Sequence, residues 1–145
     1  MPADSPRQTV MPVGIALIPC DSVYADPSSG KQALIGMFNL ITARAFPVIH
    51  PRMCIFASLT DVHQNTRCKV DIVNGETDAV VFSAEGPMAA ANPTVICDMI
   101  FQLNNLTFQE PGTYFIRLIG NGQILLQRPF NVVLQPPQPR SQSPQ

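Results

Sequence analysis

The sequence predicts an all-β protein, an antiparallel β-sandwich of about eight or nine short strands. Apolar and polar residues alternate over many short segments, and clusters of Gly, Pro, Asn and Asp separate these segments. No segment has the spacing of apolar residues that is typical of an amphipathic helix. With 145 residues, the chain is long enough for one domain whose core needs neither a disulfide nor a metal. We place this domain at residues 13–135, between a disordered Pro-rich arm at 1–12 and a disordered Pro/Gln-rich tail at 136–145.

The first half of the chain contains three predicted strands and one crossover. A strand at 15–24 includes Pro19, which lacks an N–H donor, so we expect a sheet edge or a bulge there. The nearly continuous apolar run at 32–42 predicts one long strand, buried on both faces or covered by a partner on one. Residues 45–51 contain Pro47 and Pro51, so we expect this segment to form an irregular crossover between the sheets. A strand at 53–60 directs one set of residues to the core: Met53, Ile55, Ala57 and Leu59.

The second half of the chain alternates more regularly, with predicted strands at 67–73, 94–103 and 128–134. The expected core residues of these strands are Cys68, Val70, Ile72, Val95, Cys97, Met99, Phe101, Leu103, Phe130, Val132 and Leu134, whereas Arg67, Lys69 and Asp71 are expected in solvent. Asn74-Gly75 predicts a tight hairpin because both residue types accept positive φ, and Gly120-Asn121-Gly122 predicts a second one. Gly75 and Gly122 are therefore expected to be structural residues.

The stretch from Glu110 to Tyr114 predicts an immunoglobulin-like (Ig-like) architecture. A Tyr shortly after a Pro-Gly turn begins the corner strand of many Ig-like sandwiches, where its hydroxyl bonds to the backbone across the corner. Tyr114 and Gly112 are therefore expected to anchor the fold. The chain has no Trp, and Ile116 stands where an Ig domain would carry its second core Cys. The likeness to Ig domains is architectural, and it implies none of their binding functions.

Four landmarks extend the pattern along the chain: Asp21-Ser22-Val23, Gly30-Lys31 leading into residues 34–38, Phe46 to Pro51, and Glu110 to Tyr114. With these landmarks, the region from about residue 15 to 134 resembles a family of small bacterial domains of unknown function. The resemblance implies a compact β-sandwich that is often encoded as a stand-alone protein. It implies no activity.

The composition disfavours several classes of function. Charged residues make up 13% of the chain, against about 25% in a typical domain, and such a surface resists association less well. A net charge of −1 gives no reason to expect nucleic-acid binding. There is neither an apolar run of membrane-spanning length nor a signal-peptide pattern, so we expect a cytoplasmic protein. In that reducing compartment the four cysteines are expected to be free thiols.

Candidate catalytic and metal-binding residues have simpler structural explanations. His50 with Cys54, and His63 with Cys68, have zinc-ligand chemistry but lack the spacing of structural zinc sites. Cys54 beside His50 is also the basis of a less favoured hypothesis, a Cys-dependent enzyme. Asp21, Asp26 and Asp61 are placed where carboxylates end strands and turns. We expect no catalytic residue, no cofactor and no metal.

Apolar residues also recur opposite the core sets of their strands: Phe56, Ile96, Ile100, Phe115, Ile119 and Val133. Such residues either belong to the core of the second sheet through bulges or form an exposed interaction surface. Our leading hypothesis is a non-enzymatic protein that acts through contact with a partner protein or as a homodimer. The alternative is a module that binds a small ligand or carbohydrate in a groove near Phe46 and His50.

Overall fold

In a computed structural model, which describes residues 11–88 and 90–136, nine strands and no helix are present among the described residues. The strands are β1 (Val13–Ala25), β2 (Gln32–Met37), β3 (Leu40–Ala43), β4 (Val48–Thr60), β5 (Thr66–Asn74), β6 (Val80–Met88), β7 (Cys97–Phe108), β8 (Gly112–Gly120) and β9 (Gln123–Leu134). Residues 1–10 and 137–145, which include most of the expected arm and tail, lie outside the described residues. Pro12, at the end of the expected arm, is buried.

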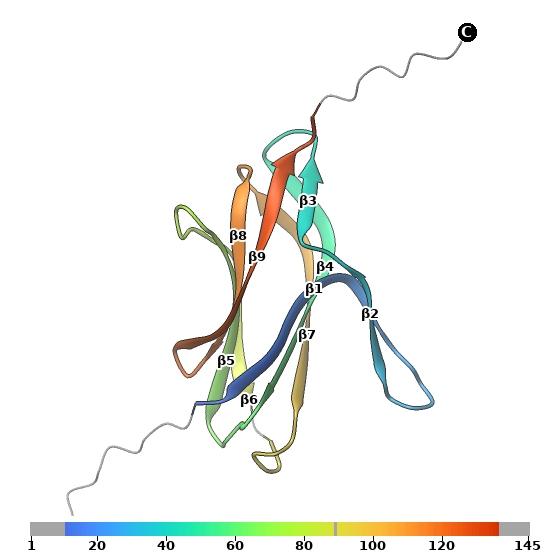
Figure 1. Cartoon of the computed structure of the whole chain (residues 1–145), viewed down its shortest axis with the longest axis vertical. Coiled ribbons are helices and arrows are strands. Elements are labelled where there is room, and N and C mark those ends of the chain that lie inside the picture. The colour runs from blue at the N-terminus through green and yellow to red at the C-terminus, as the bar shows by residue number, and fades with distance from the viewer. Residues whose placement is uncertain (1–10, 89, 137–145) are drawn as a thin grey trace, which may run out of the picture.

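The strands form two sheets that pack face to face (Figure 1). Sheet A has the order β2-β1-β4-β7, and sheet B has the order β3-β9-β8-β5-β6. All pairings are antiparallel except that of β3 with β9, which is parallel. The predicted Ig-like β-sandwich is therefore confirmed, with one parallel pair that the prediction did not include.

The core lies between the sheets and contains predicted alternating residues of β4 and β5, together with residues of β8. Met53, Ile55, Ala57 and Leu59 of β4, Val70 and Ile72 of β5, and Ile116 and Leu118 of β8 are all completely buried. Burial of side chains of this size contributes roughly 1.5–3 kcal/mol each. Three predicted assignments are wrong. Leu134 and Val95 are exposed, and Val95 lies before the start of β7. Asp71 is buried, where it accepts a 2.7 Å hydrogen bond from the Ser83 hydroxyl.

The corner predicted from the Pro-Gly turn is present. The Tyr114 hydroxyl donates a 2.6 Å hydrogen bond to the Glu110 carbonyl, and Gly112 begins β8. The Tyr114 ring lies 5.0 Å from that of Phe108 in an edge-on arrangement and 5.8 Å from that of Phe130. This aromatic group fills one end of the core and bonds its single polar atom to the corner.

The two predicted hairpins differ in outcome. Asn121 and Gly122 both have positive φ (48° and 84°), and Gly120 pairs with Gln123, so this two-residue turn is confirmed. The hairpin after Asn74 is instead a longer loop that is closed by a hydrogen bond from the Asn74 N–H to the Ala79 carbonyl. The prediction of a tight Asn-Gly turn is therefore wrong. Gly75 does not have positive φ, and glycine is needed there because the backbone approaches Thr113 closely.

The single strand predicted at 32–42 is two strands in different sheets. Gly36 has a φ of 70°, and after Met37 the chain leaves β2 in sheet A and enters β3 in sheet B. The hairpin that joins β1 and β2 projects from the rest of the sandwich (Figure 1). The expected burial of both faces is wrong for β2, since Ile35 and Met37 are exposed.

The crossover predicted at 45–51 is shorter than expected, because β4 begins at Val48 and includes His50 and Pro51. The Phe46–Pro47 peptide bond is cis. Asn105 of β7 stands opposite Pro51 with a φ of 54°, and on both strands the alternation of inward and outward residues changes there.

Pro19 lies where β1 changes partners. The first half of β1 pairs only with β4, whereas the half that follows Pro19 pairs with β2. The first half therefore has one open edge, as predicted, and Arg128 of β9 covers part of it. Its Nη1 donates to the Leu17 carbonyl at 3.3 Å, and its Nη2 donates to Asn39 Oδ1 at 2.7 Å. Arg128 thereby joins sheet B to sheet A.

Candidate interaction surface

The outer face of sheet B is a solvated surface with paired charges. Arg67 Nε donates to Glu85 Oε1 at 2.9 Å, and Lys69 Nζ lies 3.6 Å from Asp71 Oδ2. Arg117 Nε donates to Gln127 Oε1 at 2.9 Å. The exposed Arg67–Glu85 pair contributes little to stability, whereas Asp71 is buried beside Lys69. Charged groups on this face oppose the docking of an apolar partner.

The outer face of sheet A is apolar by comparison. Ile18, Phe56 and Ile100 stand opposite one another on β1, β4 and β7 and therefore share this face. Met37 and Ile35 extend the apolar surface onto β2 through their pairing with Cys20 and Ser22. We call the group Ile18, Ile35, Met37, Phe56 and Ile100 the apolar face. Of the exposed members, Ile100 is 42%, Ile35 52% and Met37 63% accessible.

Polar residues border the apolar face on both sides. Beyond the row that contains Phe56, the Ser58 hydroxyl donates a 2.8 Å hydrogen bond to Asp98 Oδ1. Toward the other end of β4, Arg52 pairs with Asn104. One acidic and one basic residue therefore stand on opposite sides of an apolar centre. An apolar centre with a polar rim is the usual anatomy of a protein interface.

The structure separates the residues predicted to form one interaction surface. Phe56 and Ile100 are neighbours on sheet A, but Phe115 and Ile119 lie on the outer face of sheet B, on the opposite side of the sandwich. Ile96 is exposed just before β7. The predicted set therefore does not form one surface. Sequence reasoning missed Ile18, Ile35 and Met37, although the uninterrupted apolar run of β2 was a signal of an uncovered face.

Phe46 and His50, near which a ligand groove was predicted, are both partly buried. Phe46 is half-buried against the core, and the ring of His50 lies 5.9 Å from the ring of Phe38. His50 Nε2 is buried and has no hydrogen-bond partner among the described residues. Burial lowers the pKa of His50, which favours its neutral form. His50 therefore packs, partly buried, beside Phe38 at this end of the sandwich.

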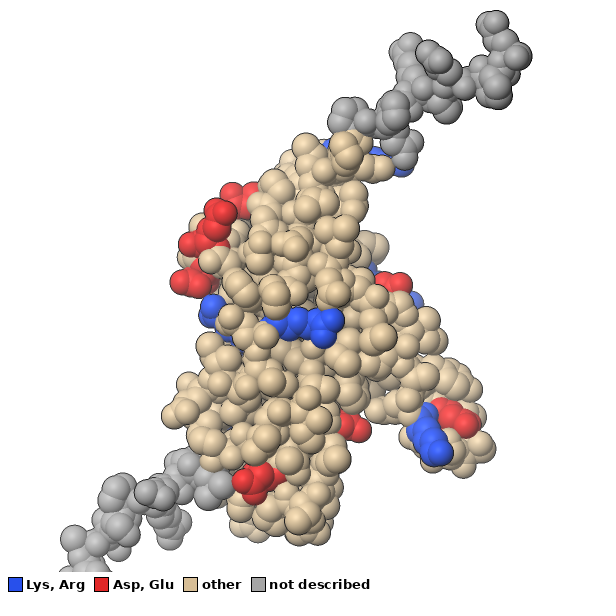
Figure 2. Space-filling view, in the orientation of Figure 1, with Lys and Arg blue, Asp and Glu red and all other residues tan. Residues whose placement is uncertain are grey.

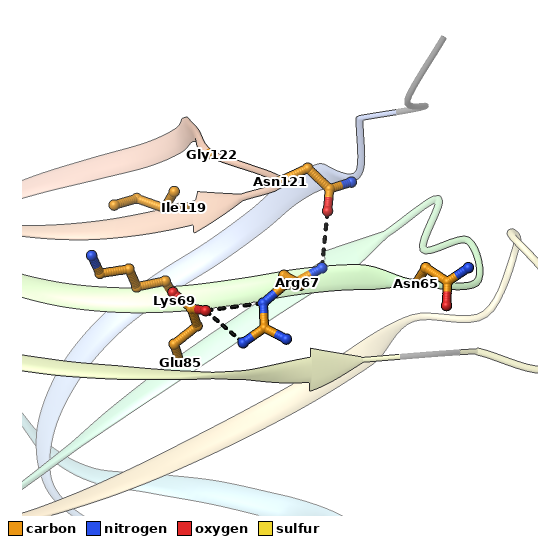
Figure 3. A pocket seen from close by; sticks show the side chains of 7 residues that line it. All are labelled: Asn65, Arg67, Lys69, Glu85, Ile119, Asn121 and Gly122. Atoms are coloured by element: carbon orange, nitrogen blue, oxygen red, sulfur yellow. Dashed lines mark hydrogen bonds and ion pairs between the residues drawn. The ribbon is translucent and has the colours of Figure 1, made fainter. Parts of the chain in front are cut away.

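A hollow of about 410 Å³ lies on the outer face of sheet B (Figure 3). Its lining residues are Asn65, Arg67, Lys69, Glu85, Ile119, Asn121 and Gly122. The Arg67 N–H donates to Asn121 Oδ1 at 2.9 Å, so the hairpin after β8 is fastened to β5. The Arg67 and Glu85 charges neutralise each other across this hollow.

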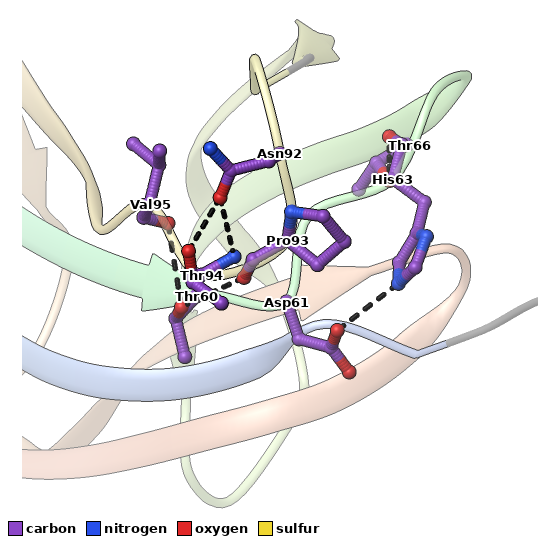
Figure 4. Close-up of polar contacts among 8 residues, drawn as sticks. All are labelled: Thr60, Asp61, His63, Thr66, Asn92, Pro93, Thr94 and Val95. Atoms are coloured by element: carbon purple, nitrogen blue, oxygen red, sulfur yellow. Dashed lines mark hydrogen bonds and ion pairs between the residues drawn. The ribbon is translucent and has the colours of Figure 1, made fainter.

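The corner after β4 holds the pair of Asp61 and His63 (Figure 4). His63 Nε2 lies 3.0 Å from Asp61 Oδ1. A nucleophile paired with this histidine is not found nearby among the described residues, because the Thr66 hydroxyl donates to the His63 carbonyl and the Thr60 hydroxyl to the Pro93 carbonyl. The Asp61 N–H also donates to the Pro93 carbonyl at 2.9 Å. These contacts fasten the corner to the segment that precedes β7.

The four cysteines are free thiols, as expected. Cys20 stands opposite Cys54 on the outer face of sheet A, and both are buried. Burial raises the pKa of the Cys20 and Cys68 thiols, and a second thiol nearby raises each further. His50 and Cys54 are four residues apart on one strand, a span of about 13 Å, so they do not meet. Within residues 11–88 and 90–136, no three His, Cys, Asp or Glu side chains gather as metal ligands.

These features define an Ig-like β-sandwich that carries ion pairs on the outer face of sheet B and the apolar face on sheet A. The sequence of residues 15–133 matches the family of unknown function DUF6941, and the chain belongs to this family. The expected resemblance to such a family is thereby confirmed. In the part of the chain that the structure describes, no helix is long and apolar enough to span a membrane.

Two solved structures are similar to this chain at low sequence identity. An immunoglobulin-like protein from Pseudomonas aeruginosa is 10% identical, with a TM-score of 0.39, and the match covers 88% of this chain and 99% of that one. The alkylpurine DNA glycosylase AlkC from Pseudomonas fluorescens is 10% identical, with a TM-score of 0.45. That match covers 81% of this chain but only 30% of the glycosylase. A comparison with curated proteins found no match.

Proposed function

We propose that this protein is a non-enzymatic contact module that forms a homodimer through the apolar face of sheet A. The contrast between the two outer faces carries the proposal: sheet B presents paired charges, whereas sheet A presents Phe56 and Ile100 at its centre. Contiguous exposed apolar surface is characteristic of protein interaction sites. The free thiols fit a reducing compartment, so we also propose a cytoplasmic location.

A second copy is the partner that the charges around the apolar face favour. An interface between identical chains is usually closed by a two-fold axis. An axis that lies in the interface along the row of Ile18, Phe56 and Ile100 brings the Arg52 side of one copy toward the Asp98 side of the other. The low charge of the chain limits repulsion between copies, and Figure 2 shows broad uncharged areas on the side in view.

The test is the mass of the protein in solution as a function of concentration. We expect sedimentation equilibrium of the wild type to approach twice the monomer mass at high concentration. The Ile100→Glu variant is expected to remain a monomer, because the charge would be desolvated in the interface. Ile124→Glu is the matched control, since Ile124 is exposed on β9 of the other sheet. A wild type that stays monomeric, or equal effects of the two variants, would contradict the proposal.

A second candidate function is the binding of a carbohydrate or another small ligand in the hollow of sheet B. Its volume of about 410 Å³ is within the range of ligand pockets, and Asn65 and Asn121 can bond to hydroxyl groups. The expected result is an increase of the unfolding temperature by one member of a sugar panel, lost in Asn121→Ala. A panel without any shift would leave the homodimer as the only proposal.

A further inference from the structure

A second apolar site lies on the open side of the sandwich, between β6 and β7. It is a cleft of about 370 Å³, and the residues that carry the argument are Cys68, Ala84, Met88, Met99 and Phe101. The Cys68 Sγ lies 3.9 Å from Met88 Sδ at the bottom of the site. The cleft therefore brings together residues from both sheets.

The core is incompletely covered along this side. β6 is the last strand of sheet B, and β7 is the last strand of sheet A. Their inward residues Phe82, Met88, Met99 and Phe101 are only half-buried, although they pack against the core. Inward residues of the inner strands, such as Ile55 and Ile72, are completely buried. A further strand on this side would bury the inward residues of both edges.

The edge of β7 is better suited to pairing than the edge of β6. From Cys97 to Phe108, β7 contains no Pro, Gly, Lys or Arg, and Asp98 is its one charged residue. Edge strands that resist pairing usually carry such residues. In β6, by contrast, Pro87 has no N–H to donate, and Glu85 projects beside it in an ion pair with Arg67. An added strand would thus find main-chain partners along the regular part of β7, from Cys97 to Asn104.

We propose that the cleft binds an extended segment of a partner protein, which adds to the free edge of β7 as a further strand. Peptides that bind in this way obtain affinity from main-chain hydrogen bonds and specificity from alternate side chains in pockets. The pocket here is apolar, and its two methionines can adapt to different side chains. The bound segment therefore carries uncharged apolar residues at alternate positions. This site and its partner are distinct from those of the homodimer, although Ile100 borders both.

The binding test uses a short fluorescent peptide of alternating Val and Thr residues. We expect saturable binding by fluorescence anisotropy at protein concentrations below those that give a dimer. Met88→Lys places a charge at the cleft and is expected to weaken binding about tenfold or more. Val80→Lys is the matched control, because Val80 is exposed at the opposite end of β6 and outside the cleft. Its affinity for the peptide is expected to equal that of the wild type.

Hydrogen exchange of the wild type provides a measurement that needs no variant. Bound peptide is expected to slow exchange of amides in β7 more than in β6, and replacement of alternate peptide residues by Pro is expected to abolish the effect. The inference would be overturned by the absence of binding up to millimolar peptide, by equal binding of the Pro-containing peptide, or by equal effects of Met88→Lys and Val80→Lys. Without peptide, slower exchange of β7 at higher concentrations of the Ile100→Glu variant would assign the edge to a second copy instead, because this variant is expected not to form the homodimer through sheet A. The peptide results do not depend on whether the homodimer forms.

Discussion

The hydroxyl of Tyr114 donates to the Glu110 carbonyl inside the corner between β7 and β8. The ring is almost completely buried, so in this corner the phenol oxygen exchanges water for a backbone acceptor. Burial raises the pKa of Tyr114, which keeps the hydroxyl protonated and able to donate. The hydroxyl group of Tyr114 therefore helps to hold the backbone of this turn in place.

Tyr114→Phe removes this hydrogen bond and leaves the Glu110 carbonyl without its donor. We expect the free energy of unfolding to fall by about 1 kcal/mol or more, measured by urea denaturation. Tyr24→Phe is the control, because the Tyr24 side chain is largely exposed, and its effect is expected to be close to zero. Equal stabilities of the two variants would exclude an anchoring role for the hydroxyl.

His50 gives the protein a pH-dependent stability. Because burial lowers its pKa in the folded state, the unfolded state takes up a proton first as the pH falls below about 6.5. The contribution of neutral His50 is therefore complete above that pH and is lost as the pH falls through the folded-state pKa. We expect the wild type to lose more stability than His50→Gln between about pH 7.5 and 5, measured by urea unfolding. Identical pH profiles would contradict this prediction.

At the scale of the element, the hairpin after β5 depends on a close contact. A Cβ on Gly75 would lie 2.7 Å from the Thr113 carbonyl oxygen and 2.8 Å from Phe115 Cε2. The Gly75 N–H donates to that same carbonyl at 2.8 Å, so the loop cannot move away without losing the bond. The short distance and the hydrogen bond together require glycine.

Gly75→Ala is expected to lower the free energy of unfolding by about 1–3 kcal/mol. Gly86→Ala is the matched control in the adjacent strand, where an added Cβ meets nothing within 4 Å. We expect Gly86→Ala to leave stability unchanged or to raise it slightly, because alanine loses less backbone entropy on folding. Thermal unfolding of both variants measures the difference. A Gly75→Ala midpoint equal to that of the wild type would show that the loop adapts.

The strands that sequence reasoning located best were those with one buried and one solvated face. The alternation in β5 and β8 identifies their inward residues, and residues such as Val70 and Ile116 are indeed buried. The run at 32–42 was predicted less well, because alternation within a strand does not show that Gly36 ends one pairing and that β3 joins the other sheet. The prediction of a tight Asn-Gly turn was wrong for a similar reason: the atoms that crowd Gly75 belong to β8, which is distant in sequence.

The candidate surface was partly predictable for the same physical reason. The alternation of side chains along each strand identified Phe56 and Ile100 as outward-facing, and the pairing of β4 with β7 places them together. Alternation alone could not assign Phe115 to the other sheet, because long-range pairing decides which strands share a sheet. The cleft between β6 and β7 was not predicted, since it exists only where two edges of different sheets approach each other.

At the scale of the whole molecule, the proposed homodimer uses the outer face of sheet A and leaves that of sheet B in solvent. Dimerisation through sheet A would stabilise the folded state by mass action, so the thermal midpoint should rise with protein concentration. The Ile100→Glu variant should lose this dependence and Ile124→Glu should retain it, measured by calorimetry at several concentrations. A concentration-independent midpoint in the wild type would agree with a monomer and count against the dimer.

The parallel pair of β3 with β9 also affects how the chain is made. Leu40 pairs with Asn131, so β3 leaves the ribosome long before the strand that it joins. At a synthesis rate of roughly 5–20 residues per second, β3 waits on the order of ten seconds for β9. Arg128, which fastens the two sheets together, arrives in that same last strand. Until β9 arrives, β3 has no partner strand and sheet B cannot be completed, so the sandwich closes only at the end of synthesis.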